Sequence, residues 1–128
     1  MVRYSLSAWE AVRRAAAVVL TTTDGDGLAR VSPPVKLAMR GGRGYLALPP
    51  GSSVIAHVQR EPRLLVAPAT ARGRTTGPAL DATAELLDET SARTAAREVT
   101  AEYGLLSRLT RRRGALVHLR IVPVRPAT

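Results

Sequence analysis

The chain has 128 residues, a length that suits a single folded domain, and it contains no cysteine. The absence of cysteine excludes a disulfide framework, a thiolate nucleophile and a cysteine-ligated metal site. The formal net charge at pH 7 is +9, and Lys36 is the only lysine among 19 basic residues. Such an arginine bias suits recognition of phosphate or carboxylate by forked donors, and it equally suits a biased genome composition. No apolar run reaches the length of a membrane span and the N-terminal layout is a poor signal peptide, so we expect a cytoplasmic protein.

The chain is expected to open with a short helix whose apolar face includes Trp9 and Val12. A β-branched, apolar strand is predicted over residues 16–23. The sequence Asp-Gly-Asp-Gly at residues 24–27 then predicts a tight hairpin turn.

The next segment, residues 28–40, alternates clearly and predicts one long strand. One face is apolar, and the other carries two cations and a hydroxyl that face either solvent or a ligand. Pro33 and Pro34 cannot donate ladder hydrogen bonds, so the strand is expected to be at an edge or bulged there. The apolar face comprises Val31, Pro33, Val35, Leu37 and Met39, and the other face Arg30, Ser32, Pro34, Lys36 and Ala38.

The rest of the chain predicts further strands at 45–48, 63–68, 79–87 and 115–124, a short helix ended by Pro62, and a longer helix at 88–103. The strand at 63–68 is apolar on both faces, which favours cover on both sides. Hairpin-linked strands with few helices indicate a mainly β (α+β) fold: one domain built as a six-stranded antiparallel barrel with peripheral helices.

Two neighbouring features form a candidate anion cradle. Ser52 and Ser53 suit the N-terminus of the short helix, where backbone N–H groups attract anions. The segment at residues 71–78, which we call the hinge, carries further anion-binding side chains: Arg72, Arg74, Thr75 and Thr76. The alternative interpretation is a capped surface helix followed by a solvated loop.

Conventional catalytic groups are scarce in this sequence. His57 and His118 are the only imidazoles, and both are expected at a surface or an interface rather than as a base or in a metal site. The spacing shows no serine–histidine–aspartate arrangement, phosphate-binding loop or dinucleotide fingerprint. If the protein is an enzyme, its chemistry must therefore come from a bound cofactor.

The order of motifs resembles the pyridoxamine 5′-phosphate oxidase-like split β-barrel superfamily, and most closely its small oxidoreductases dependent on coenzyme F-420, a deazaflavin. The resemblance covers about residues 16–124, and its most specific part is EPRLLVAPATARGRTTGP. The other matching segments are VVLTTTDGDG, GGRGYLAL, SSVIAHVQR, ALDATAELL, EYGLLSRL and GALVHLRIVP.

This resemblance implies a homodimer with two cofactor sites at the subunit interface. The second strand would run along the cofactor ring, while the start of the short helix and the hinge would hold the phosphate. Relatives usually carry a phosphate-binding lysine where Val54 stands by register, and the next helical cation of the family pattern falls at Ala56, so Lys36, Arg72 or Arg74 would have to compensate. The implied cofactor-binding residues are Ser32, Pro33, Pro34, Val35, Lys36, Ser52, Ser53, Arg72, Arg74, Thr75 and Thr76.

The implied activity is hydride transfer from reduced coenzyme F-420 to a small unsaturated or quinone-like acceptor. One alternative keeps the fold and uses FMN, and another is a non-catalytic carrier of a flavin, a deazaflavin or a tetrapyrrole. Nucleic-acid binding through the basic run at residues 111–113 is disfavoured, because no aromatic side chains interleave with it.

Overall fold

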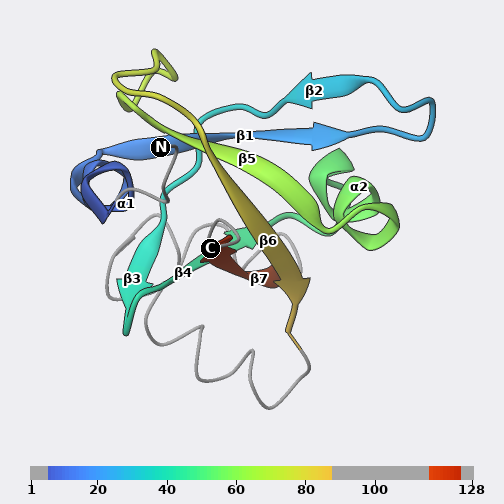
Figure 1. Cartoon of the computed structure of the whole chain (residues 1–128). Coiled ribbons are helices and arrows are strands. Elements are labelled where there is room, and N and C mark those ends of the chain that lie inside the picture. The colour runs from blue at the N-terminus through green and yellow to red at the C-terminus, as the bar shows by residue number, and fades with distance from the viewer. Residues whose placement is uncertain (1–5, 88–115, 125–128) are drawn as a thin grey trace.

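The computed structural model describes residues 6–87 and 116–124, which form a strongly bent β-sheet with two helices packed against it (Figure 1). The predicted helix at 88–103 and the basic run at 111–113 lie outside the described residues. In the described part, no helix is long and apolar enough to cross a membrane. The elements are α1 (Leu6–Arg14), β1 (Ala17–Thr23), β2 (Ala29–Val31), β3 (Ala38–Arg40), β4 (Arg43–Leu48), α2 (Ser53–Arg60), β5 (Arg63–Ala69), β6 (Leu80–Leu86) and β7 (Val117–Pro123).

All neighbouring strands of the sheet are antiparallel, as the hairpin-rich sequence predicts, and their order is β2-β1-β5-β6-β7-β4-β3. The sheet is not closed, because β2 and β3 lie at its two ends and do not pair with each other. The long-range pairing of β4 with β7 places Leu48 opposite Val117. As a result, β7 lies between β6 and β4, and both of these strands precede it by more than 30 residues in the sequence.

The prediction of one long strand over residues 28–40 was wrong. The segment forms two separate strands, β2 and β3, so the sheet has seven strands rather than six, and Val31 of the predicted apolar face is 68% exposed. The break falls at Pro33 and Pro34, which have no N–H for a ladder. Residues 32–37, which we call the crossing segment, pass from one end of the sheet to the other. They are joined to β1 at two points. Ser32 N donates to Leu20 O at 2.8 Å, and an isolated bridge has Val18 N donating to Val35 O at 2.8 Å and Val35 N donating to Val18 O at 2.9 Å.

Apart from Trp9, the buried core is built from aliphatic side chains, and the sequence contains no phenylalanine. Each long strand contributes alternate residues, and both helices add an apolar face. The predicted alternation of β6 is confirmed, since Ala82 and Ala84 are buried while Asp81 and Glu85 are exposed. The buried core residues are Trp9, Val12, Val18, Leu20, Leu46, Leu48, Val54, Val58, Leu64, Val66, Ala82, Ala84, Leu119 and Ile121.

Strand β5 is only partly covered on its second face. Ala67 and Ala69 are buried there with Val19 of β1, in a small cluster separate from the core. Leu65 on the same face is 38% exposed. We therefore distinguish an outer face of the sheet, the side opposite the main core, on which apolar side chains remain in contact with solvent.

The predicted turn at residues 24–27 joins β1 to β2 and is stabilised by one carboxylate. Asp24 Oδ1 accepts hydrogen bonds from the N–H groups of Asp26 at 2.9 Å and Leu28 at 3.0 Å. Asp24 Oδ2 accepts from Arg30 Nε at 2.6 Å. The Arg30 hydrogen bond is the main cause that lowers the pKa of Asp24 to about 2, so this carboxylate stays charged in mildly acidic solution.

Candidate functional site

The hinge begins with a tight turn that presents its arginines to solvent. Gly73 N donates to Thr70 O at 2.9 Å, and Thr70 N donates to Arg74 O at 2.8 Å. The Thr70 hydroxyl accepts a further hydrogen bond from Arg74 N at 3.2 Å. Gly73 has φ +95°, a value that favours glycine. The turn leaves Arg72 and Arg74 exposed, as are Thr75 and Thr76.

This turn packs against the crossing segment. A Cβ atom at Gly73 would lie 3.2 Å from Pro34 Cδ and 3.4 Å from Pro34 Cγ, so the glycine backbone lies directly on the proline ring. The next part of the hinge returns to β5, where Thr76 N donates to Pro68 O at 2.9 Å. Two of the predicted site segments, residues 32–36 and the hinge, are thus brought together within one chain.

Within the crossing segment, the predicted site residues differ in what they can offer a ligand. The Ser32 hydroxyl is engaged with backbone, accepting from Leu20 N at 3.0 Å and donating to Pro33 O at 2.8 Å. Val35 is half-buried against the core and bonded to Val18. Pro33 and Lys36 are exposed. The apolar surface that remains for a ligand in this segment is therefore that of the proline pair, mainly the exposed ring of Pro33.

The short helix begins as predicted. Ser52 is the N-cap of α2, and its hydroxyl accepts from Val54 N at 3.3 Å. Ile55 N donates to Ser52 O at 3.2 Å, whereas Ser53 is exposed. The Ser52 hydroxyl is thus hydrogen-bonded within the helix, and Ser53 is the serine that faces solvent.

Val54 is not the position from which a cation would reach a ligand at this helix start. Its side chain is 5% exposed and belongs to the core, because α2 packs this face against the sheet. Ala56 is exposed and lies one helical turn after Ser52 and Ser53. The register that gives the family's lysine at Val54 therefore corresponds to a buried position in this chain, and compensation by Lys36, Arg72 or Arg74 stays a prediction.

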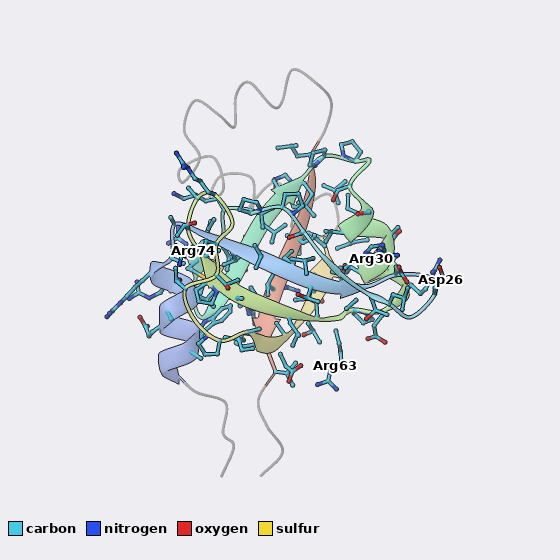
Figure 2. All side chains as sticks on the ribbon, turned by 90° about the horizontal axis from the view of Figure 1, so that it is seen from above. Asp26, Arg30, Arg63 and Arg74 are labelled. Carbon is cyan, nitrogen blue, oxygen red and sulfur yellow. The ribbon has the colours of Figure 1, made fainter. Side chains whose placement is uncertain are left out.

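The structure does not bring Ser52 and Ser53 to the hinge of the same chain. The hinge precedes Leu80, the first residue of β6. The segment that leads into α2 starts after Leu48, which pairs with Val117 at the start of β7. The start of β7 lies beside Leu86, the last residue of β6, so α2 and the hinge adjoin opposite ends of β6. Figure 1 shows the hinge loop and α2 at opposite ends of β1 and β5. Figure 2 likewise places Arg74 at the end where α1 lies, and Arg30 and Asp26 at the other end.

Two contacts fix α2 to the first hairpin. The Thr22 hydroxyl is hydrogen-bonded to His57 Nδ1 at 2.7 Å, and Thr22 is 2% exposed. The guanidinium of Arg60 lies over Gly25, where a Cβ atom would need that side chain to move. His57 is therefore half-buried and occupied by a core hydroxyl, while His118 lies on β7 opposite Ala47. Among the described residues, no group of three or more histidine, aspartate or glutamate side chains could hold a metal ion.

The roles of Thr22 and Thr70 were not predicted from the sequence. Thr22 is one of three successive threonines in an apolar strand, and only its parity with Val18 and Leu20 hints that it points inward. Thr70 stands just before the hinge, and the signal for its role is the glycine three residues later, at a spacing that suits a tight turn.

No family model matches this chain, and no curated protein does. Several solved structures share its fold. The haem storage protein HutZ from Vibrio cholerae is 12% identical, with 98% of this chain and 93% of that chain covered and a TM-score of 0.73. A reductase dependent on F-420-H2 is 19% identical, with 83% and 92% covered and a TM-score of 0.62.

A third structure, a candidate pyridoxamine 5′-phosphate oxidase from Listeria innocua, is 15% identical, with 89% of this chain and 88% of that chain covered and a TM-score of 0.58. At these identities the comparison shows similarity of fold alone. The mainly antiparallel sheet, its two open ends and its peripheral helices agree with it. The chain thus has the split β-barrel fold of the pyridoxamine 5′-phosphate oxidase-like proteins.

Proposed function

We propose that this protein binds a flavin-type cofactor, coenzyme F-420 with FMN as the alternative, between the subunits of a homodimer. The observation that carries the proposal is the contact between Gly73 and Pro34, which sets an arginine- and threonine-bearing turn against a proline pair. FMN and coenzyme F-420 each have two parts that need different surroundings, a flat ring system and a phosphate. The two adjoining segments supply one surface for each.

The donor set fits such a cofactor. Forked guanidinium groups on Arg72 and Arg74 suit a phosphate, and the Thr75 and Thr76 hydroxyls add neutral donors. Pro33 is exposed and Pro34 is half-buried beside Gly73, and together they offer apolar surface without N–H groups, which suits the face of a ring. A bound deazaflavin or flavin would supply the hydride chemistry, and the chain would bind it, orient it and exclude water.

A homodimer completes the cradle in this proposal. Ser53 and the start of α2 lie at the far end of their own chain from the hinge, so they would serve a cofactor held by the partner's hinge. Apolar side chains on the outer face, Leu65 and Val122, support an interface there, since they are 38% and 36% exposed. The acceptor would then be a small unsaturated or quinone-like molecule above the exposed cofactor ring.

A non-catalytic carrier of a flavin or a tetrapyrrole is the second candidate. A flavin carrier without catalysis is supported by the predicted site residues, none of which has an imidazole or a carboxylate to act as a general acid or base. One of the structural neighbours is a haem storage protein, so the fold also occurs in proteins with that role.

Fluorescence titration of the purified protein with coenzyme F-420, FMN and haemin tests the proposal. We expect Arg74→Ala to weaken binding of the preferred flavin by about tenfold or more, because a charged hydrogen bond is worth about 1.5–3 kcal/mol. The matched control is Arg43→Ala, which removes an exposed arginine from the turn between β3 and β4. Haemin binding without flavin binding would favour the carrier. Equal losses in the two variants would show that the hinge does not hold the phosphate.

A further inference from the structure

The side chain of Thr70 closes the turn that carries the exposed arginines. Its backbone forms two of the closing hydrogen bonds, to Gly73 N and Arg74 O. Its hydroxyl forms a third by accepting from Arg74 N at 3.2 Å. The turn continues in an isolated bridge between Ala69 and Thr75. Arg74 is thus held on both of its backbone polar groups by a single residue.

The turn has a defined position as well as a defined shape. Gly73, with φ +95°, lies on the Pro34 ring, so the turn is in contact with the crossing segment on that side. On the other side it is joined to β5 through Thr70. The directions in which Arg72 and Arg74 leave the backbone are therefore set by Thr70 and by the glycine–proline contact.

We propose that Thr70 is a positioning residue for the anion-binding half of the cofactor site. This rests on the proposed function, because it assigns a role to Thr70 within that site. In this role the hydroxyl acts as an acceptor from Arg74 N rather than as a ligand of the anion. It acts by holding the arginine backbone, so that the guanidinium groups are arranged before a phosphate arrives and less order is lost on binding.

Thr70→Val tests this role, because valine keeps the branched shape and removes the acceptor. We expect amide hydrogen exchange at Arg74, measured by NMR on the unliganded protein, to become about fivefold faster, the factor that one neutral hydrogen bond provides. Binding of FMN should weaken by a similar factor, whereas riboflavin, which lacks the phosphate, should bind as it does to the wild type. Thr70→Ser restores the hydroxyl and should restore both measurements.

If the protein prefers coenzyme F-420, the same comparison uses F-420 and its phosphate-free deazaflavin fragment. Thr83→Val is the matched control, since it removes a threonine hydroxyl of β6 that donates to the Val122 carbonyl of β7, away from the turn. It should change neither exchange at Arg74 nor the ratio of the two affinities.

Three results would overturn the assignment. Unchanged exchange at Arg74 in Thr70→Val would show that the hydroxyl does not hold the turn. Equal weakening of the phosphorylated and phosphate-free ligands would show a structural role only. If the wild type binds no flavin or deazaflavin, the proposed function itself fails, and faster exchange in Thr70→Val would then leave the residue only a turn-closing role.

Discussion

At the scale of the residue, Val54 and Ala56 show why side-chain direction decides what a substitution can do. They are two positions apart on α2, but Val54 is in the core and Ala56 faces solvent. A lysine at residue 54 would carry its charge into an apolar interior, whereas one at residue 56 would stand beside the exposed Ser53.

We expect Val54→Lys to lower the free energy of unfolding by about 3 kcal/mol, because it buries an unpaired charge, and not to tighten cofactor binding. Ala56→Lys should leave stability within about 0.5 kcal/mol of the wild type and tighten FMN binding by about tenfold through a new charged hydrogen bond. Urea denaturation and fluorescence titration measure the two effects. A stable Val54→Lys protein with increased affinity would contradict the placement of α2.

At the scale of the element, the position of α2 depends on the hydrogen bond between Thr22 and His57. This bond connects a core strand to the helix, and Thr22 is the buried polar side chain found among the described core positions. We expect Thr22→Val to lower the free energy of unfolding by about 1 kcal/mol, because it leaves His57 Nδ1 without its partner.

A double-mutant cycle with His57→Ala should give a coupling energy of about 1 kcal/mol. Thr21→Val, the same change at the half-buried neighbour that faces the other side of β1, is the control and should show no coupling to His57→Ala. Independent, additive losses at residues 22 and 57 would mean that the hydrogen bond does not hold the helix.

The hairpin at residues 24–27, the cap at Ser52 and the alternation of β6 could all be predicted, because each depends on residues close in sequence. The break in the strand predicted at 28–40 was only half predicted. Pro33 and Pro34 indicated an interruption, but the transfer of residues 38–40 to the opposite end of the sheet depends on β4 and β7. The contact of Gly73 with Pro34 leaves no local sequence signal, and the inward direction of Thr22 leaves only its parity with Val18 and Leu20.

At the scale of the whole molecule, the outer face of the sheet bears on assembly. Leu65 pairs across the sheet with Asp81, and Val122 with Thr83, so both apolar side chains belong to one surface of β5, β6 and β7. We expect the wild type to be a dimer by light scattering at micromolar concentration, since covering this surface removes apolar area from water.

Leu65→Asp should convert the dimer to a folded monomer and abolish cofactor binding, because it places a charge at the centre of that surface. Leu28→Asp is the control, as Leu28 is an exposed leucine beside the hairpin turn rather than on the long strands of this face. It should leave the molecular mass unchanged. A wild-type protein that stays monomeric would remove the basis for a site shared between subunits.

The separation of the hinge from the start of α2 has a genetic consequence if each site takes its hinge from one subunit and its helix from the other. A chain with Arg74→Ala and a chain with Ser53→Asp would each be defective when expressed alone. Mixed dimers of the two would contain one site with both defects and one site with neither. Co-expression should therefore recover about half the normal cofactor per mixed dimer, an intersubunit complementation that a site confined to one chain would never show.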